Sequence, residues 1–451
     1  MTLKTLIHGG RVIDPANHVD SKLNLLIQDR KIAWVGKEMP EADERIDATG
    51  KIVCPGFIDI HMHEDKVGED GKIRFDILGS MLRMGVTTAV GGNCGINVYD
   101  PVEYLKLVDE NGAPVNVAMF AGHEYFRKAA GAEDIYAEAT ETQKRAMEGG
   151  IRTALEGGCV GVSFGLRYVP GANKDEFFRA AACCQKENKL ISSHVRDDAD
   201  GIFDAIDEFC AAGVAFGIPV QISHIGSMGG FGQMEAVLQQ IDAYRMNGLD
   251  IAMDCYPYFA FSTKVGTPTY DPGWLQRYHC DYGVLEFCEG KYKGQRATKE
   301  TFEEMRLCFP QCITVCYVMQ ESDVRKAYRH PAVMVGSDGL LNDGQGHPRA
   351  SGSFPRFIAE FVRKGDISLY EAIEKMTAMP SNRLGLSNKG RLNVDADADI
   401  TIFDYEKIKD NATFASPVLP PEGIDYVFIG GQIAARNCQI VKNDCGKAVR
   451  K

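Results

Sequence analysis

The sequence lacks long apolar runs, and none of its segments approaches the roughly 18 unbroken apolar residues that a bilayer-spanning helix needs. We also expect no signal peptide, because MTLKTLIHGG reaches Gly9 after only a few apolar residues. Fixed-period repeats, low-complexity tracts and long runs of charge are missing as well. The order of strand and helix patterns therefore carries most of the information on the fold.

An excess of positive charge is missing too. The 62 aspartates and glutamates outnumber the 50 lysines and arginines, which gives a formal net charge of −12. Binding to nucleic acid normally needs a basic face, so we expect no nucleic-acid partner. The 14 cysteines are scattered along 451 residues, unlike the disulfide framework of a short secreted protein. We expect a soluble protein of the reducing cytoplasm, with no membrane partner.

Short alternating runs separated by turn residues occur at both ends of the chain and predict strands. They lie at residues 23–28, 31–35, 399–403, 426–431 and 432–437. The middle of the chain has a different pattern. We therefore predict that residues 1–55 and 390–451 form one composite β-rich domain.

Eight apolar strand-like runs alternate with amphipathic helical stretches between residues 56 and 389, as in a parallel sheet built from βα units. The runs are 56–61, 86–90, 115–120, 159–164, 190–194, 220–224, 250–255 and 332–336, with helices at 174–187, 201–212, 233–247 and 368–378. This α/β pattern predicts a (β/α)8 TIM-like barrel, whose chemistry lies at the carboxyl ends of the strands. The stretch from about 259 to 331 is too long for one loop and predicts an inserted lid.

Side chains that can bind a metal follow five of these strands. Strand one ends in His61-Met62-His63, and residues two apart on a strand point to the same side. Alone, such a pair is more often structural. The further candidates are Cys94, His194, His224 and Asp338, after strands two, five, six and eight. Thiolate, imidazole and carboxylate groups that converge in this way predict a metal site and favour Zn²⁺.

Ten motifs carry a resemblance to a known family. They are PGFIDIHMH, GNCG, SSHVRD, ISHIG, GSDG, AGHEYFR, FGLRYVPG, DCYPY, HPRASGSFPR and DNATF. Together they resemble the metal-dependent amidohydrolase superfamily and, within it, the D-aminoacylase (N-acyl-D-amino-acid deacylase) branch, over nearly the whole chain. The resemblance implies a barrel with a small β-sandwich built from both termini. It also implies zinc-dependent hydrolysis of the amide bond of N-acyl-D-amino acids.

The resemblance further implies roles for the candidate ligands. The tighter zinc ion is held by Cys94, His194 and His224, and a second position, weakly occupied or empty, by His61, His63 and Asp338. The branch uses this cysteine where many relatives use a carboxylated lysine of strand four, and residues 159–164 contain no lysine. Asp338 is the expected general base, although an aspartate after a strand is otherwise more often a helix cap.

Substrate recognition is expected to centre on a carboxylate, for which a guanidinium is the natural partner. By resemblance, Arg349 binds it together with Tyr256 and Ser262; a structural role is the alternative for each. Many deacylases of the branch carry a lysine two residues after the strand-six histidine, where this chain has Gly226. Arg167 is our candidate to replace the positive charge of this missing lysine. The alternative is that Arg167 is a solvated loop arginine.

Other basic residues have less defined roles. Lys264 is a second candidate to replace the charge of the missing lysine. The lid contributes Arg277, Lys291 and Lys293, but their spacing in the sequence does not tell which way their side chains point. His123 adds no obvious seventh ligand, so we expect it to be structural.

Three classes of function remain open. The first is the N-acyl-D-amino-acid deacylase. The second is a cyclic amidase or deaminase of the same superfamily, like a hydantoinase or dihydroorotase, which Gly226 makes credible. The third is a non-catalytic scaffold, which the intact ligand set disfavours. The expected partner is a small N-acyl amino acid or related amide, with a homo-oligomer as an open option.

Overall fold

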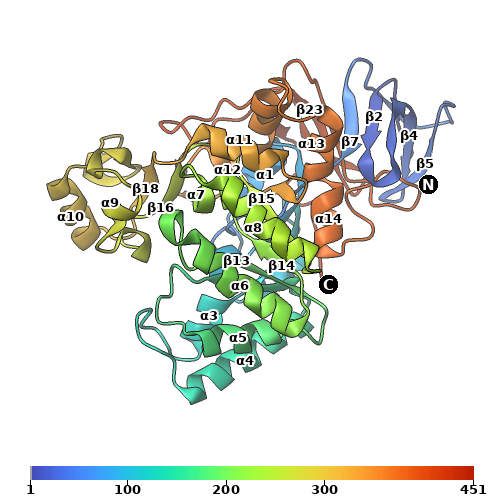
Figure 1. The fold of residues 1–451 in the computed structure, drawn as a ribbon. Coiled ribbons are helices and arrows are strands. Elements are labelled where there is room, and N and C mark those ends of the chain that lie inside the picture. The colour runs from blue at the N-terminus through green and yellow to red at the C-terminus, as the bar shows by residue number, and fades with distance from the viewer. Residues whose placement is uncertain (1–2) are drawn as a thin grey trace.

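The computed structural model describes residues 3–451, and a barrel of parallel strands forms its centre (Figure 1). The strands are β8 (Phe57–Asp59), β9 (Val86–Gly91), β10 (Asn116–Met119) continued by β11 (Ala121–Gly122), β12 (Gly161–Gly165), β13 (Leu190–His194), β14 (Val220–Ile222), β15 (Ile251–Cys255) and β19 (Val333–Val335). The ring closes where Met62 bridges Gly339 in parallel and the Asp338 amide donates to the His61 carbonyl at 2.7 Å. This confirms the predicted barrel, because each of the eight apolar runs supplies one strand.

Amphipathic helices follow the strands and cover the barrel. They include α1 (Asp76–Arg83), α2 (Pro101–Asn111), α4 (Glu141–Glu156), α5 (Lys174–Ala182), α6 (Ile202–Phe216), α8 (Met234–Met246), α11 (Glu321–Arg329) and α13 (Leu369–Met376). A capping box starts α13, since the Ser368 side chain accepts from the Glu371 amide. Helix α5 ends earlier than predicted, and α6 runs further, to a left-handed Gly217 at φ 62°.

Two sheets from the two ends of the chain pack into a sandwich beside the barrel (Figure 1). One contains β1 (Thr5–His8), β4 (Asn24–Gln28), β5 (Lys31–Gly36) and β6 (Glu44–Asp47); the other contains β2 (Arg11–Asp14), β3 (Val19–Lys22), β7 (Ile52–Pro55), β22 (Ile400–Phe403), β23 (Ile424–Ile429), β24 (Gln432–Arg436) and β25 (Gln439–Ile440). Antiparallel pairing of β7 with β22 joins the two ends of the chain. The sandwich from both termini is confirmed, and 1–55 with 390–451 remain our proposal for the limits of the domain.

The last residues of the chain leave the sandwich and run along the barrel. The Val117 amide donates to the Lys447 carbonyl at 3.0 Å, and the Val449 amide donates to the Val117 carbonyl at 2.8 Å. Further along, the Lys451 amide donates to the Gly158 carbonyl. The tail thus provides hydrogen-bond partners for backbone groups of β10, whereas β11, the continuation of this strand, pairs with β12.

An inserted unit lies between strands β15 and β19 and projects from the barrel at the left of Figure 1. Its elements are β16 (Phe261–Lys264), α9 (Trp274–Arg277), β17 (Leu285–Phe287), α10 (Lys299–Cys308) and β18 (Ile313–Cys316). The rings of Tyr270, Trp274 and Phe302 pack together, with centroids 5.2 Å and 5.4 Å from that of Trp274. Helix α11, at the end of the predicted lid segment, instead packs against α8 of the barrel. No helix in residues 3–451 has the length and apolar character to cross a membrane.

Candidate metal centre

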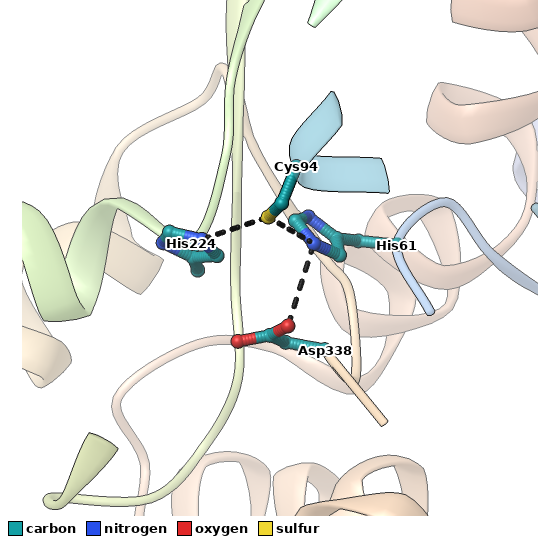
Figure 2. Close-up of side chains that lie close together, drawn as sticks. All are labelled: His61, Cys94, His224 and Asp338. Carbon is teal, nitrogen blue, oxygen red and sulfur yellow. Dashed lines mark hydrogen bonds and ion pairs between the residues drawn. The ribbon is translucent and has the colours of Figure 1, made fainter. Parts of the chain in front are cut away.

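Four of the predicted side chains converge at the carboxyl end of the barrel (Figure 2). His61, Cys94, His224 and Asp338 are buried, and one ligand atom from each lies within 4.8 Å of the others. The Cys94 sulfur lies 3.5 Å from Nε2 of both His61 and His224. They come from four different strand ends, which the curvature of the closed barrel brings to one point.

The two remaining candidates lie at the edge of this group. Nε2 of His63 is 3.1 Å from Oδ1 of Asp338. The His194 ring centroid is 4.7 Å from that of His224, and His194 is also within hydrogen-bond reach of Cys94. All six predicted side chains therefore belong to one cluster.

Three of these residues have a left-handed backbone, which is uncommon for residues other than glycine. The φ angles are 53° at Cys94, 34° at His224 and 50° at Asp338. Such backbone strain collects at sites that the surrounding structure holds in place. Around Cys94, the flanking glycines allow close approach, because a Cβ on Gly92 would lie 2.4 Å from the Phe120 carbonyl oxygen. The turn after β9 thus directs the thiol into the barrel mouth.

Buried partners fix the orientation of two histidines. Nδ1 of His61 lies 3.0 Å from Oδ1 of Asp254, which also accepts the His224 backbone amide at 2.8 Å. The Gln221 side-chain amide donates to the other Asp254 oxygen at 3.0 Å. Nδ1 of His224 contacts the Ser227 hydroxyl at 3.0 Å. In both histidines Nε2 is therefore the nitrogen left to face Cys94.

The electrostatics of the cluster favour an ionised Cys94 and Asp338 and a neutral His194, whereas Asp254 and Cys94 outweigh burial and raise the pKa of His61. Burial raises the pKa of a thiol, but His61 and His224 outweigh this, and the pKa of Cys94 lies well below its usual range. Burial also opposes ionisation of Asp338, yet Arg349 and His224 hold the pKa of that carboxyl well below its usual range. Burial lowers the pKa of His194, which keeps its imidazole neutral. A thiolate, a carboxylate and neutral imidazole are the forms that bind a metal.

The donor set matches zinc better than the hard cations. Sulfur and imidazole nitrogen are typical zinc ligands, whereas Mg²⁺ and Ca²⁺ take oxygen. In addition, Nδ1 of His194 is buried without a hydrogen-bond partner among the described residues. A bound cation would satisfy groups of this kind, so the residues present fit a zinc site.

A pocket opens next to the cluster, and His194, His224 and Asp338 form part of its wall. Arg349, Tyr256 and Ser262 also line it, as expected for substrate contacts. The Arg349 guanidinium is ion-paired with Oδ2 of Asp338 at 2.9 Å and stacks 4.7 Å from the centre of the Tyr256 ring. It also donates to the Ser262 carbonyl at 3.3 Å.

The other basic candidates do not line this pocket. Arg167 is largely buried and pairs with Asp197 and Asp198, so it lies behind the pocket wall. Its position therefore matches neither the expected contact with substrate nor the alternative of a solvated loop arginine. Arg277 also pairs with Asp198, at 2.9 Å. Their side chains satisfy nearby carboxylates, which the spacing along the chain did not reveal.

The remaining candidates lie further from the pocket. Lys264 is exposed, Lys291 pairs with Glu304, and Lys293 donates to Gln345. His123 is buried at 2.9 Å from Glu176, in line with a structural role.

Several residues that the structure places in or beside the site were not predicted from the sequence. Asp254 orients His61, while Tyr168, Asp198 and Thr269 line the pocket. Asp254 and Tyr168 belong to motifs quoted above, and a buried acid at the end of strand seven was the available signal. Asp198 precedes a short 3-10 helix and Thr269 lies within another, Pro268–Tyr270, and only the fold determines where these segments lie.

Comparison with known proteins identifies the family. A model of the amidohydrolase family matches residues 44–99 and 97–435. N-acyl-D-glutamate deacylase of Alcaligenes xylosoxydans xylosoxydans is 34% identical over 95% of this chain and 93% of its own length.

The crystal structure of N-acyl-D-glutamate deacylase from Bordetella bronchiseptica, complexed with zinc and a phosphonate inhibitor, matches with a TM-score of 0.89 at 30% identity over 100% of both chains. A structure of D-aminoacylase, described by one-metal activation and second-metal attenuation of its binuclear centre, matches with a TM-score of 0.89 at 27% identity, again over 100% of both chains. The chain therefore belongs to the amidohydrolase family, in its D-aminoacylase branch, and is a metal-dependent hydrolase of carbon–nitrogen bonds.

Proposed function

We propose that this protein is a zinc-dependent deacylase that hydrolyses the amide bond of N-acyl-D-amino acids. The observation that carries the proposal is the buried group His61, Cys94, His224 and Asp338 at the carboxyl end of the barrel. The pocket beside it is lined by Arg349, a partner for a carboxylate. The related deacylases act on N-acyl-D-amino acids, as their names state.

Zinc would be held in two unequal positions. We assign the tighter position to Cys94, His194 and His224, and the second, weak or empty, to His61, His63 and Asp338. The lowered pKa of the Cys94 thiol supports its role as an anionic ligand. When bound, zinc polarises a carbonyl group and lowers the pKa of water, which makes hydroxide available near neutral pH.

Asp338 is the proposed general base. Its carboxyl lies in the pocket wall and is held ionised by Arg349, so it can accept the proton that the attacking water loses. The same carboxyl then passes this proton to the departing amine, which leaves in a neutral or protonated form. The Arg349 ion pair and the contact with His63 keep the carboxylate oriented toward the reacting atoms.

Arg349 and Tyr256 are the proposed carboxylate contacts, with Ser262 beside them. Nη1 of Arg349 is ion-paired with Asp338, but Nε is buried without a partner among the described residues, so the guanidinium has a donor free for a substrate oxygen. The Tyr256 hydroxyl, also in the pocket wall, donates to the Met319 sulfur at 3.8 Å, which is a weak acceptor. Holding the carboxylate here would place the amide of the substrate beside Asp338.

A second candidate function is that of a cyclic amidase, and Gly226 favours it. A Cβ on Gly226 would lie 2.7 Å from the Cys255 sulfur, so this position presents neither a charge nor space for a side chain. A substrate without a carboxylate, such as a hydantoin, does not need that charge. The non-catalytic scaffold is the least favoured class, because the ligand set is intact.

Zinc-loaded protein assayed with N-acetyl-D-amino acids, their L enantiomers and hydantoins separates these functions. We expect release of free amino acid from the D series only. Ring opening of hydantoins without deacylation would replace the proposal by the second candidate. Cys94→Ala is the matched negative control, since a contaminating enzyme would not depend on this residue.

A further inference from the structure

The charges that line the pocket restrict the substrates that it can hold. Within residues 3–451, its lining includes one arginine, Arg349, and two carboxylates, Asp198 and Asp338, but no lysine. Asp338 and Arg349 are paired with each other at 2.9 Å. Under the proposed function, a substrate with one carboxylate would use the free Nε donor of Arg349, and the pocket wall has no further permanently charged cation for a second carboxylate.

Asp198 contributes a second carboxylate to the pocket wall. Its Oδ1 atom pairs with Nη2 of Arg167 at 3.0 Å and with Nε of Arg277 at 2.9 Å, while Oδ2 accepts the Tyr278 hydroxyl at 2.6 Å. Neither arginine lines the pocket. The two arginines are therefore already used by carboxylates of the protein and offer the pocket no free cation.

Neutral groups complete this part of the pocket. Met228 and Phe261 supply apolar surface. The Thr269 hydroxyl is buried in the lining without a hydrogen-bond partner among the described residues. A buried hydroxyl without a partner costs free energy that a ligand oxygen or nitrogen can recover.

We propose that the pocket selects N-acyl amino acids with a single carboxylate and a neutral side chain, and that Thr269 forms a hydrogen bond with a polar neutral side chain. The inference rests on the proposed deacylase function and narrows its substrate class. An acidic side chain would be buried in a pocket whose nearest cations, Arg349 and the two arginines at Asp198, are already paired with carboxylates of the protein, which is unfavourable. The specificity thus differs from that stated in the name of the glutamate deacylase to which the chain is 34% identical.

Two matched substrate pairs test the role of charge. N-acetyl-D-glutamine against N-acetyl-D-glutamate, and N-acetyl-D-asparagine against N-acetyl-D-aspartate, differ in charge with little change of shape. We expect kcat/KM to be roughly 100-fold or more higher for each amide than for its acid. Equal or faster turnover of the acids overturns the inference but leaves the deacylase function standing. Absence of hydrolysis of every D compound by zinc-loaded protein overturns both.

Two variants test the role of the hydroxyl. Thr269→Val keeps the shape and removes the donor, so kcat/KM for N-acetyl-D-glutamine should fall about tenfold, whereas N-acetyl-D-methionine should change less than about twofold. Thr267→Val is the matched control, because Thr267 does not line the pocket and its hydroxyl donates to the Lys264 carbonyl. Equal losses on both substrates would mean that Thr269 acts on the fold and not on the side chain of the substrate.

Discussion

Replacing Asp254 by asparagine tests whether a carboxylate behind the metal centre fixes its ligands. Oδ1 of Asp254 receives Nδ1–H of His61 at 3.0 Å and the His224 amide at 2.8 Å, so one buried oxygen orients groups from strands one and six. The side chain of Asp254 is 1% exposed. The substitution keeps the shape and removes the charge.

The expected loss can be worked out from these contacts. A hydrogen bond to a charged acceptor contributes about 1 kcal/mol more than one to a neutral acceptor, so two bonds lose about 2 kcal/mol. At about 1.4 kcal/mol per tenfold change, this corresponds to a roughly 30-fold weaker zinc affinity. Mutation of other carboxylates behind metal-binding histidines lowers metal affinity or activity by about 10- to 100-fold. Gln221 can turn its amide toward the new amide, because its Oε1 atom has no partner now, so the fold should persist.

Competition with a chromophoric zinc chelator measures this affinity without any substrate. The matched control is Asp250→Asn, directly before the first residue of β15, where the side chain is 70% exposed and pairs with Arg383. It should leave zinc affinity unchanged. A zinc affinity for Asp254→Asn within about twofold of the wild type, with His61→Ala strongly weakened, would refute the reasoning.

Four further changes have defined outcomes. Cys94→Ala should remove most zinc and nearly all hydrolysis, because it deletes the thiolate ligand; full zinc content by metal analysis contradicts this assignment. Asp338→Asn should lower kcat by about 10²- to 10⁴-fold with little change in KM, and a kcat within a few-fold of wild type in zinc-loaded protein would move the base elsewhere. Arg349→Ala should raise KM and also lower kcat, because Arg349 is paired with Asp338 at 2.9 Å; steady-state kinetics that show an unchanged KM would exclude it as the carboxylate partner. Burial lowers the pKa of Lys375 from its usual 10.5 to about 8, so the unfolded chain binds more protons between these values and stability should rise with pH there. The free energy of unfolding of the wild type minus that of Lys375→Met, measured by urea denaturation, should increase from pH 8 to 10.5, and a flat difference would contradict the shift.

The barrel, and the edge of the barrel at which the site lies, were predictable because both depend on local sequence patterns. Each apolar run of strand length produced one strand, and polar residues directly after a strand reached the carboxyl edge. His61 and Asp338 could therefore be placed together although they lie 277 positions apart in the chain, from 338 − 61. The sandwich was predictable from alternation at both ends, but the departure of residues 446–451 toward β10 was not.

The sequence by itself determined which side chains reach the mouth of the barrel, since strand length and the alternation of side chains are properties of short segments. Only the tertiary structure decided which partner each of them takes. Arg167 turns to Asp198, 31 positions away, and His61 takes Asp254, 193 positions away. Such pairings follow from the relative position of loops after the barrel closes, because a buried charge takes the nearest opposite charge in space, wherever that residue lies in the chain.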